Sequence, residues 1–93
     1  MALHVLKTLS RYFQAMPGAC DYGKTFELRP NDRNFQMNDT VLFVEGENIE
    51  TPKATIYGRI DYVLTAEQAK ADGIGGLQDG WCVFAWTLIG ANP

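Results

Sequence analysis

Three segments of this chain have side chains that alternate with a period of two residues, which is the repeat of a β-strand. They span residues 25–29, 54–64 and 81–88. In the first, Phe26 and Leu28 are predicted to point inward, and Thr25, Glu27 and Arg29 outward. In the segment 54–64, one face carries Ile56, Ile60, Tyr62 and Leu64. In the segment 81–88, one face carries Cys82, Phe84, Trp86 and Leu88. These patterns favour a sheet and argue against a helical bundle.

Two further segments are predicted to be strands. Residues 3–9 alternate loosely, and residues 40–45 are apolar on both faces, as in a central strand. Gly58 lies inside the predicted strand 54–64 and indicates a bulge or a bend. A small barrel needs such irregularities to close.

Two short helices are predicted between the strands. Ser10 is the expected N-cap of a helix over 11–16, and Thr65 that of a helix over 66–71. The first helix is expected to bury Tyr12, Phe13 and Met16. Glycine, proline and polar residues place loops at 17–23, 46–52 and 72–80.

The predicted fold is therefore mainly β with short helices (α+β), in a single domain over residues 1–93 arranged as a small, partly open β-barrel. A chain of 93 residues fits one small domain. Four aromatic residues are assigned to its core without a functional role: Phe13, Phe35, Phe43 and Trp86.

Composition narrows the class of protein. The longest unbroken apolar run covers residues 81–86, far short of the ~20 residues that a membrane helix needs. No basic stretch followed by an apolar segment precedes Lys7, so no secretory signal is expected. A single histidine and two cysteines without a CxxC spacing, Cys20 and Cys82, offer few metal ligands. We expect a cytoplasmic protein with reduced thiols, without membrane association, metal or cofactor.

Charge is distributed unevenly along the chain. The formal net charge is −3. Residues 1–37 carry five basic and three acidic side chains, a balance of +2, whereas residues 38–93 carry three basic and eight acidic ones, a balance of −5. This asymmetry is compatible with a local basic groove on an acidic body, and equally with an ordinary solvated face.

One run of residues concentrates the groups that could do chemistry. Gly23-Lys24-Thr25-Phe26-Glu27-Leu28-Arg29 places an ammonium, a carboxylate and a guanidinium within seven residues. On a strand, Glu27 and Arg29 project from the same face, about 7 Å apart. Gly23 is expected to make the loop before the strand flexible, so that the Lys24 ammonium can swing over that face. The alternative is a set of ordinary surface ion pairs.

These motifs resemble those of the ASCH domains of the PUA-like superfamily, and most closely a small bacterial and phage family of unknown function within it. The residues that carry the resemblance are His4-Val5-Leu6-Lys7, Tyr12-Phe13, the run 23–29, Asn31-Asp32-Arg33-Asn34-Phe35, Asp39-Thr40-Val41-Leu42, Gly76-Leu77 and Gly80-Trp81. The resemblance implies a PUA-like β-barrel with a cleft beside the motif strand. It also implies binding of RNA or nucleotides.

The chain departs from that pattern at two places. Asn38-Asp39 stands where such domains usually have Gly-Asp, and Asn38 is expected to keep the turn because Asn tolerates a left-handed backbone. Some small ASCH proteins hydrolyse the amide of acetylated cytidine with a K-x-x-T arrangement, but here the fourth position is Glu27. The threonine nucleophile is therefore missing from its place.

Several further residues are candidates for the cleft. They are His4, Lys7, Asp32, Arg33 and Trp81, beside Lys24, Glu27 and Arg29. His4 fits a buried strand histidine as well as a ligand contact. Trp81 could stack on a base, but it also fits plain core packing. Tyr57 and Arg59 could extend the cleft wall and otherwise are solvated strand residues.

Three functions remain open from the sequence. The first is a module that binds single-stranded RNA or a nucleotide or nucleoside, with Lys24, Arg29 and Arg33 on phosphate or carbonyl groups and Glu27 on a base amine. The second is a small amidohydrolase or nuclease, in which Lys24 and Glu27 transfer protons and Arg29 stabilises an oxyanion. The third is a phage or bacterial protein-interaction module that uses the acidic second half.

Overall fold

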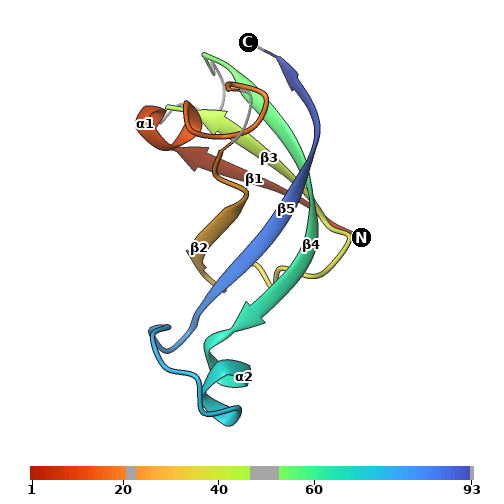
Figure 1. The fold of residues 1–93 in the computed structure, drawn as a ribbon. Helices are drawn as coiled ribbons and strands as arrows, with labels where there is room; N and C mark the ends of the chain where they lie inside the picture. Colours follow the sequence, from red (N-terminus) through yellow and green to blue (C-terminus); the bar gives the residue numbers. More distant parts are fainter. Residues whose placement is uncertain (21–22, 47–52, 93) are drawn as a thin grey trace.

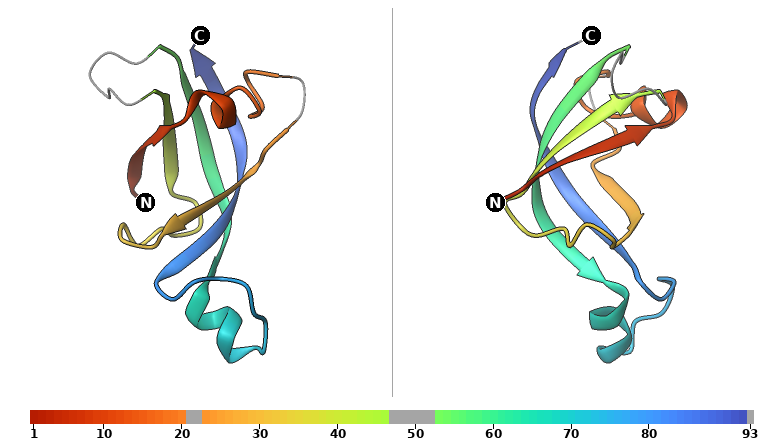
Figure 2. Two further views of the ribbon diagram at one scale, coloured as in Figure 1. Left: turned by 90° about the vertical axis from the view of Figure 1, so that its left-hand side faces the viewer. Right: turned by 180° about the vertical axis from the view of Figure 1, so that it is seen from behind.

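The computed structural model describes residues 1–20, 23–46 and 53–92 and shows one curled, five-stranded sheet (Figure 1). The strand order is β1-β3-β4-β5-β2, with β1 and β3 parallel and the other pairs antiparallel. The strands are β1 (Leu3–Thr8), β2 (Phe26–Pro30), β3 (Thr40–Glu45), β4 (Thr55–Thr65) and β5 (Trp81–Asn92). The sheet bends into a half-barrel whose two edges, β1 and β2, lie across from each other (Figure 2). The prediction of a mainly β, partly open barrel is confirmed at this level.

The core fills the concave side of the half-barrel. The four aromatic residues assigned to the core are all buried, with exposed fractions of 3% or less. The other buried apolar side chains that pack with them include Leu6, Met16, Val41, Ile56, Ile60, Cys82 and Phe84. β3 lies between β1 and β4, as its apolar pattern on both faces predicts.

Gly58 lies at a register shift between β4 and β5, which confirms the predicted irregularity. A Cβ atom at Gly58 would lie 2.6 Å from Cε3 of Trp86, so the glycine also makes room for the indole ring. A second shift between Ile60 and Tyr62 changes which side chains face the core. Tyr62 is therefore exposed, contrary to its predicted place beside Ile60, and Val63 packs against the core instead.

The predicted faces of β2 are wrong. Phe26 and Leu28 are 51% and 50% exposed, whereas Glu27 is only 5% exposed. β2 is an edge strand, and Pro30, which has no N–H to donate, is compatible with that position. Glu27 can point inward because Lys24 and Arg29 both contact its carboxylate. The alternation predicted the period of two residues correctly. Because Lys24 and Arg29 pair with Glu27, the charged face of the strand points inward and the apolar face points outward.

The helices are short and lie at opposite ends of the sheet (Figure 1). α1 (Ser10–Phe13) begins one residue before the predicted helix and ends three residues before its predicted end. Phe13 and Met16 are buried as predicted, but Tyr12 is 45% exposed. α2 (Ala66–Ala71) is capped as predicted, because Thr65 Oγ1 accepts a hydrogen bond from Gln68 N–H at 3.1 Å.

Two loop predictions extend into residues 21–22 and 47–52 and lie there outside the described residues. The prediction for Asn38 is confirmed, since its φ of 73° is in the left-handed region. Within the described part of the chain, no helix is long and apolar enough to cross a membrane.

Candidate functional site

A pocket of about 580 Å³ opens between the C-terminal end of β1, α1 and β2. Its volume lies within the range of about 300–1,000 Å³ typical of small-molecule sites. Most of its lining is apolar or aromatic, and its charged residues come from β1, from β2 and from the segment just before β2. The lining residues are Lys7, Thr8, Leu9, Tyr12, Lys24, Phe26, Glu27, Leu28, Arg29, Pro30 and Trp81.

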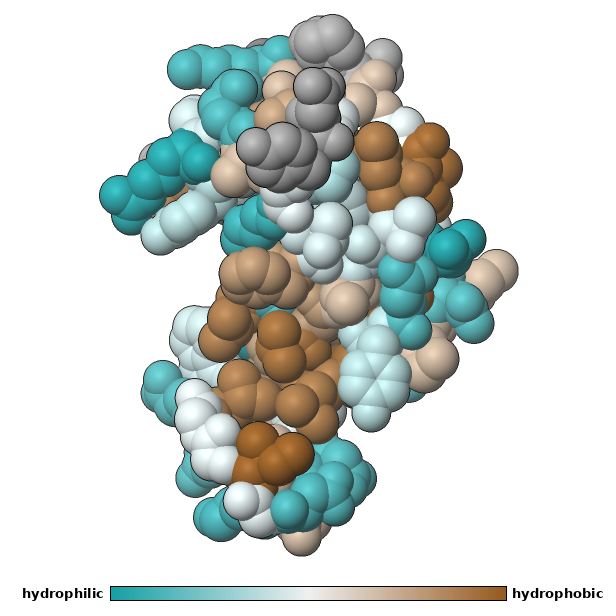
Figure 3. All heavy atoms as spheres, in the orientation of Figure 1, coloured by the Kyte–Doolittle hydropathy of each residue, from teal (hydrophilic) through white to brown (hydrophobic). Residues whose placement is uncertain are grey.

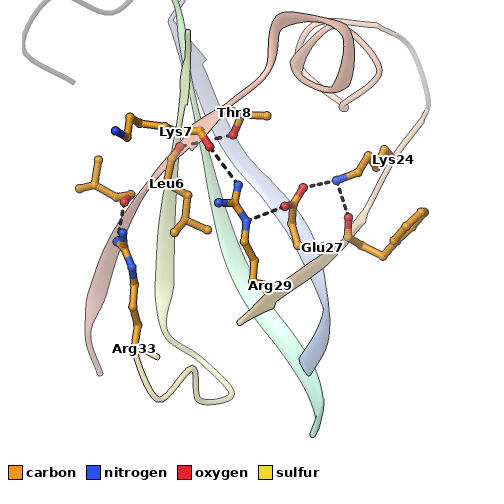
Figure 4. A network of polar contacts seen from close by, with 9 residues as sticks. Leu6, Lys7, Thr8, Lys24, Glu27, Arg29 and Arg33 are labelled. Atoms are coloured by element: carbon orange, nitrogen blue, oxygen red, sulfur yellow. Dashed lines mark hydrogen bonds and ion pairs between the residues drawn. The ribbon is translucent and has the colours of Figure 1, made fainter. Parts of the chain in front are cut away.

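The Glu27 carboxylate organises the charged side of this pocket (Figure 4). One of its oxygens, Oε1, accepts a short hydrogen bond from Lys24 Nζ. The other, Oε2, accepts one from Arg29 Nε at 3.1 Å. Both oxygens of a buried carboxylate are thus engaged by cations from its own segment of chain. Glu27 thus positions the two cations, and its predicted contact with a base amine stays a prediction.

Lys24 is fixed in place, which corrects the expectation that it swings on a flexible loop. Its backbone N–H donates to Ala15 O at 2.7 Å, and its ammonium donates to Phe26 O at 2.7 Å. A Cβ atom at Gly23 would lie 1.8 Å from Ala15 O. The glycine therefore allows the chain to pass close to the Ala15 carbonyl, and this packing helps to set the position of Lys24.

Two arginines span the gap between the edges of the half-barrel. Arg29 Nη2 donates to Lys7 O at 3.1 Å, and Arg33 Nη1 donates to Val5 O at 2.6 Å. Thr40 N–H donates to Ala2 O, so the even-numbered carbonyls of β1 face β3, and those of Val5 and Lys7 face outward. The guanidinium groups thus satisfy carbonyls of an edge strand, which also protects that edge from pairing with another chain.

The pocket is positively charged although the protein as a whole is acidic. The lining contains three cations, Lys7, Lys24 and Arg29, and one carboxylate, Glu27, which gives a formal balance of +2. The Lys7 ammonium points away from Glu27 and Arg29 (Figure 4). Lys7 has an exposed side chain, and none of the contacts between described residues engages its ammonium. At the rim, the Arg11 guanidinium lies 4.9 Å from the ring centre of Tyr12 and adds to the positive potential.

Apolar side chains surround the cations. Leu9, Tyr12, Phe26 and Leu28 are each between 45% and 51% exposed, which is unusual for four large side chains that line one pocket. Figure 3 shows apolar atoms gathered over the middle and lower part of this face, where β2 and the start of β5 lie. A ligand with a flat apolar body could cover such a surface.

Residues 3–86 match the family described as a domain of unknown function, DUF3850. The chain belongs to the DUF3850 family. The matched range includes every residue that lines the pocket. No curated protein matches the sequence. The ASCH resemblance is not tested by these comparisons and stays a prediction.

The structure of this DUF3850 domain brings together five of the eight predicted site residues: Lys7, Lys24, Glu27, Arg29 and Trp81. Arg33 is held at the edge of β1 by Val5 O and does not line the pocket. Asp32 also lies outside the lining, and its negative charge acts on Cys82. Burial, and to a lesser degree this charge, raises the pKa of the Cys82 thiol, which favours the neutral form.

His4 lies at a separate polar cluster, outside the pocket lining. It is 8% exposed, and its Nε2 lies 2.9 Å from Oδ2 of Asp39. The same carboxylate accepts hydrogen bonds from Ala2 N–H at 2.9 Å and Gln36 N–H at 3.0 Å. Burial acts to raise the pKa of Asp39, but these hydrogen bonds and the His4 charge together lower it. His4 thus fits the alternative of a buried, partnered strand histidine.

Sequence reasoning missed the apolar half of the pocket. Leu9, Tyr12 and Leu28 line it, whereas Tyr12 and Leu28 were predicted to be buried. The signal that could have found them is proline at residue 30, since proline in a strand indicates an edge, where apolar side chains can face a groove. Tyr57 and Arg59 do not line the pocket, and Arg59 pairs with Asp61 at 3.4 Å. Within the described residues, no group of three or more His, Cys, Asp or Glu side chains is arranged to hold a metal ion.

Proposed function

We propose that this protein is a cytoplasmic RNA- or nucleotide-binding module, and that its half-barrel is a PUA-like barrel of the ASCH type. The observation that carries the proposal is the pocket beside β2, which combines aromatic side chains with an excess of cations. Nucleic acid ligands need both, because bases stack on aromatic rings and phosphates pair with Lys and Arg.

The aromatic residues of the pocket supply candidate stacking surfaces. Phe26 is half exposed, and the Lys24 ammonium lies 5.2 Å from its ring centre. Trp81 is partly buried and pairs with Pro30 across β5 and β2. Tyr12 lies on the opposite side of the pocket, in α1. Stacking on such rings is worth about 1–3 kcal/mol per base.

The geometry favours binding over hydrolysis. A general base must be free to accept a proton from the reacting group. Lys24 and Glu27, the two residues that a hydrolase would use, are instead paired with each other. Thr25 does not line the pocket, so it does not replace the missing threonine nucleophile. The arrangement thus favours a role of Lys24 and Glu27 in binding over a role in proton transfer.

The test is an NMR titration with single-stranded RNA and with the ribonucleosides and their monophosphates. We expect shifts at the ends of β1 and β2 and at the Trp81 indole. Phe26→Ala should weaken binding about tenfold, whereas Tyr62→Ala, which removes an aromatic ring that is 58% exposed and outside the pocket, should leave it unchanged.

Two outcomes would contradict the proposal. One is the absence of binding to any member of the panel by a correctly folded protein. The other is release of acetate from acetylated cytidine that disappears in Lys24→Ala, since this would show a hydrolase.

If RNA binds through about three phosphates, log K should fall with log salt at a slope near −2, because each contact contributes about −0.7.

A further inference from the structure

We propose that the pocket selects a phosphomonoester, which is the phosphate of a mononucleotide or of a nucleic acid end, over the phosphodiester of an internal linkage. This inference rests on the proposed function and specifies its ligand. It follows from the charge of the pocket lining, from the pairing and burial of Glu27 and from the exposed side chain of Lys7.

Charge complementarity is the first argument. Three cations and one carboxylate give the pocket a balance of +2. A phosphomonoester carries about −1.5 to −2 charges at neutral pH, because its second pKa is about 6. A phosphodiester carries a single negative charge. The monoester is therefore the group that neutralises the pocket, and a diester would leave one cation uncompensated.

The occupancy of the Glu27 oxygens is the second argument. Lys24 and Arg29 contact one oxygen each, and Glu27 is only 5% exposed, so little of its remaining acceptor capacity faces a ligand. Arg29 uses two of its five N–H groups, on Glu27 and on Lys7 O, and the described contacts leave the other three available. The charged wall of the pocket thus offers donors rather than acceptors, which suits an oxygen-rich anion.

Lys7 is the third argument, and it also supplies the test. Its backbone carbonyl holds Arg29, but its side chain is exposed and contributes no described contact. Its ammonium points away from Arg29 and Lys24 (Figure 4), and rotation of its flexible stem would bring it to a phosphate bound between those two cations. Because only the backbone of Lys7 supports the fold, its side chain can be changed without disturbing the rest of the wall.

The experiment compares three forms of each ribonucleoside by calorimetry at low salt: the nucleoside, its monophosphate and its cyclic monophosphate, which is a diester. We expect the monophosphate to bind at least about tenfold more tightly than the other two, as for a charge-assisted hydrogen bond. Lys7→Gln should remove most of that difference. Lys70→Gln, which removes an exposed lysine from α2, should not.

A second measurement varies pH. Affinity for the monophosphate should fall as the pH drops through about 6, where the phosphate gains a proton, whereas affinity for the cyclic form should stay level. An RNA oligonucleotide with and without a terminal phosphate distinguishes the two sources of the monoester. A preference for the phosphorylated end over the mononucleotide would identify RNA, and equal affinity would identify the free nucleotide.

Different results would contradict the monoester inference and the proposal of nucleic-acid binding. Equal binding of all three nucleoside forms, or binding of internal RNA alone, would overturn the monoester inference and leave the nucleic-acid proposal standing. An unchanged monophosphate preference in folded Lys7→Gln would also overturn the inference. If neither RNA nor any nucleoside form binds, both proposals are wrong.

Discussion

Two of the buried carboxylates in the described part of the chain have similar exposure and opposite surroundings. Asp39 is 3% exposed and Glu27 is 5% exposed. Asp39 accepts hydrogen bonds from two backbone N–H groups and from His4, all of which belong to the framework of the sheet. Among the described residues, Glu27 accepts hydrogen bonds from Lys24 and Arg29 alone, and both line a pocket together with it.

This difference separates a structural carboxylate from a site carboxylate. The donors around Asp39 come from Ala2, from β1 and from the loop before β3, so the carboxylate connects segments that are distant in sequence. The donors around Glu27 come from residues two and three positions away and reach partly into solvent, with side chains 25% and 19% exposed. Burial by itself does not reveal function, but the identity of the partners does.

Asp39→Asn should have the largest effect on stability. The amide NH₂ group would replace an oxygen that faces N–H donors, and at least one donor would be left without an acceptor. We expect the free energy of unfolding to fall by about 3 kcal/mol, because an unpaired group at a buried polar cluster is costly. Urea denaturation measures this loss.

Asp61→Asn is the matched control, since Asp61 pairs with Arg59 and accepts a hydrogen bond from Thr87 Oγ1 on the surface, and its side chain is 38% exposed. Its loss should stay within about 0.5 kcal/mol. Equal losses in the two variants would show that the Asp39 cluster is no more structural than a surface ion pair.

Glu27→Gln should weaken ligand binding more than it lowers stability, in contrast to Asp39→Asn. Because Lys24 and Arg29 can reach water, the loss of stability should be only about 1 kcal/mol. Affinity for the nucleotide should nevertheless fall about tenfold, since the two cations lose the carboxylate that positions them. The measurements are urea denaturation and calorimetry on the same samples.

Glu45→Gln provides the control for that result, because Glu45 is also buried, at 8% exposure, and lies outside the pocket lining. Its nucleotide affinity should equal that of the unchanged protein. Tighter binding by Glu27→Gln would contradict a positioning role and would show that Glu27 acts only as a competing negative charge.

The sequence predicted the period of each strand better than its faces. Alternation in 25–29 placed Glu27 and Arg29 on one face, which the structure confirms, but Phe26 and Leu28 are the exposed pair. A hydrophobic pattern reports only that two faces differ. Which face turns inward depends here on two cations that neutralise a carboxylate across the edge of a half-barrel, and that pairing is tertiary.

Two of the three local features were predicted correctly; the third is wrong, because Leu9 and not Ser10 is the N-cap of α1. The Thr65 cap and the left-handed Asn38 depend on a few adjacent residues. Tyr62 could not be placed, because a register shift between β4 and β5 changes its face. The arginine contacts to Val5 and Lys7 carbonyls were equally beyond prediction, since they depend on how far the sheet curls.

The smallest expected effect concerns pH and again separates the two carboxylates. The pKa of Asp39 is lowered in the folded protein, because hydrogen bonds to the carboxylate outweigh the cost of burial. A lowered pKa gives stability that is complete above the unfolded value of about 3.9 and is lost as pH falls through the folded value. The stability difference between the unchanged protein and Asp39→Asn should thus stay constant from about pH 7 to 5 and shrink below about pH 4. Urea denaturation at several pH values measures it, and a difference that persists undiminished in acid would show that the cluster depends on shape and not on the charge of Asp39.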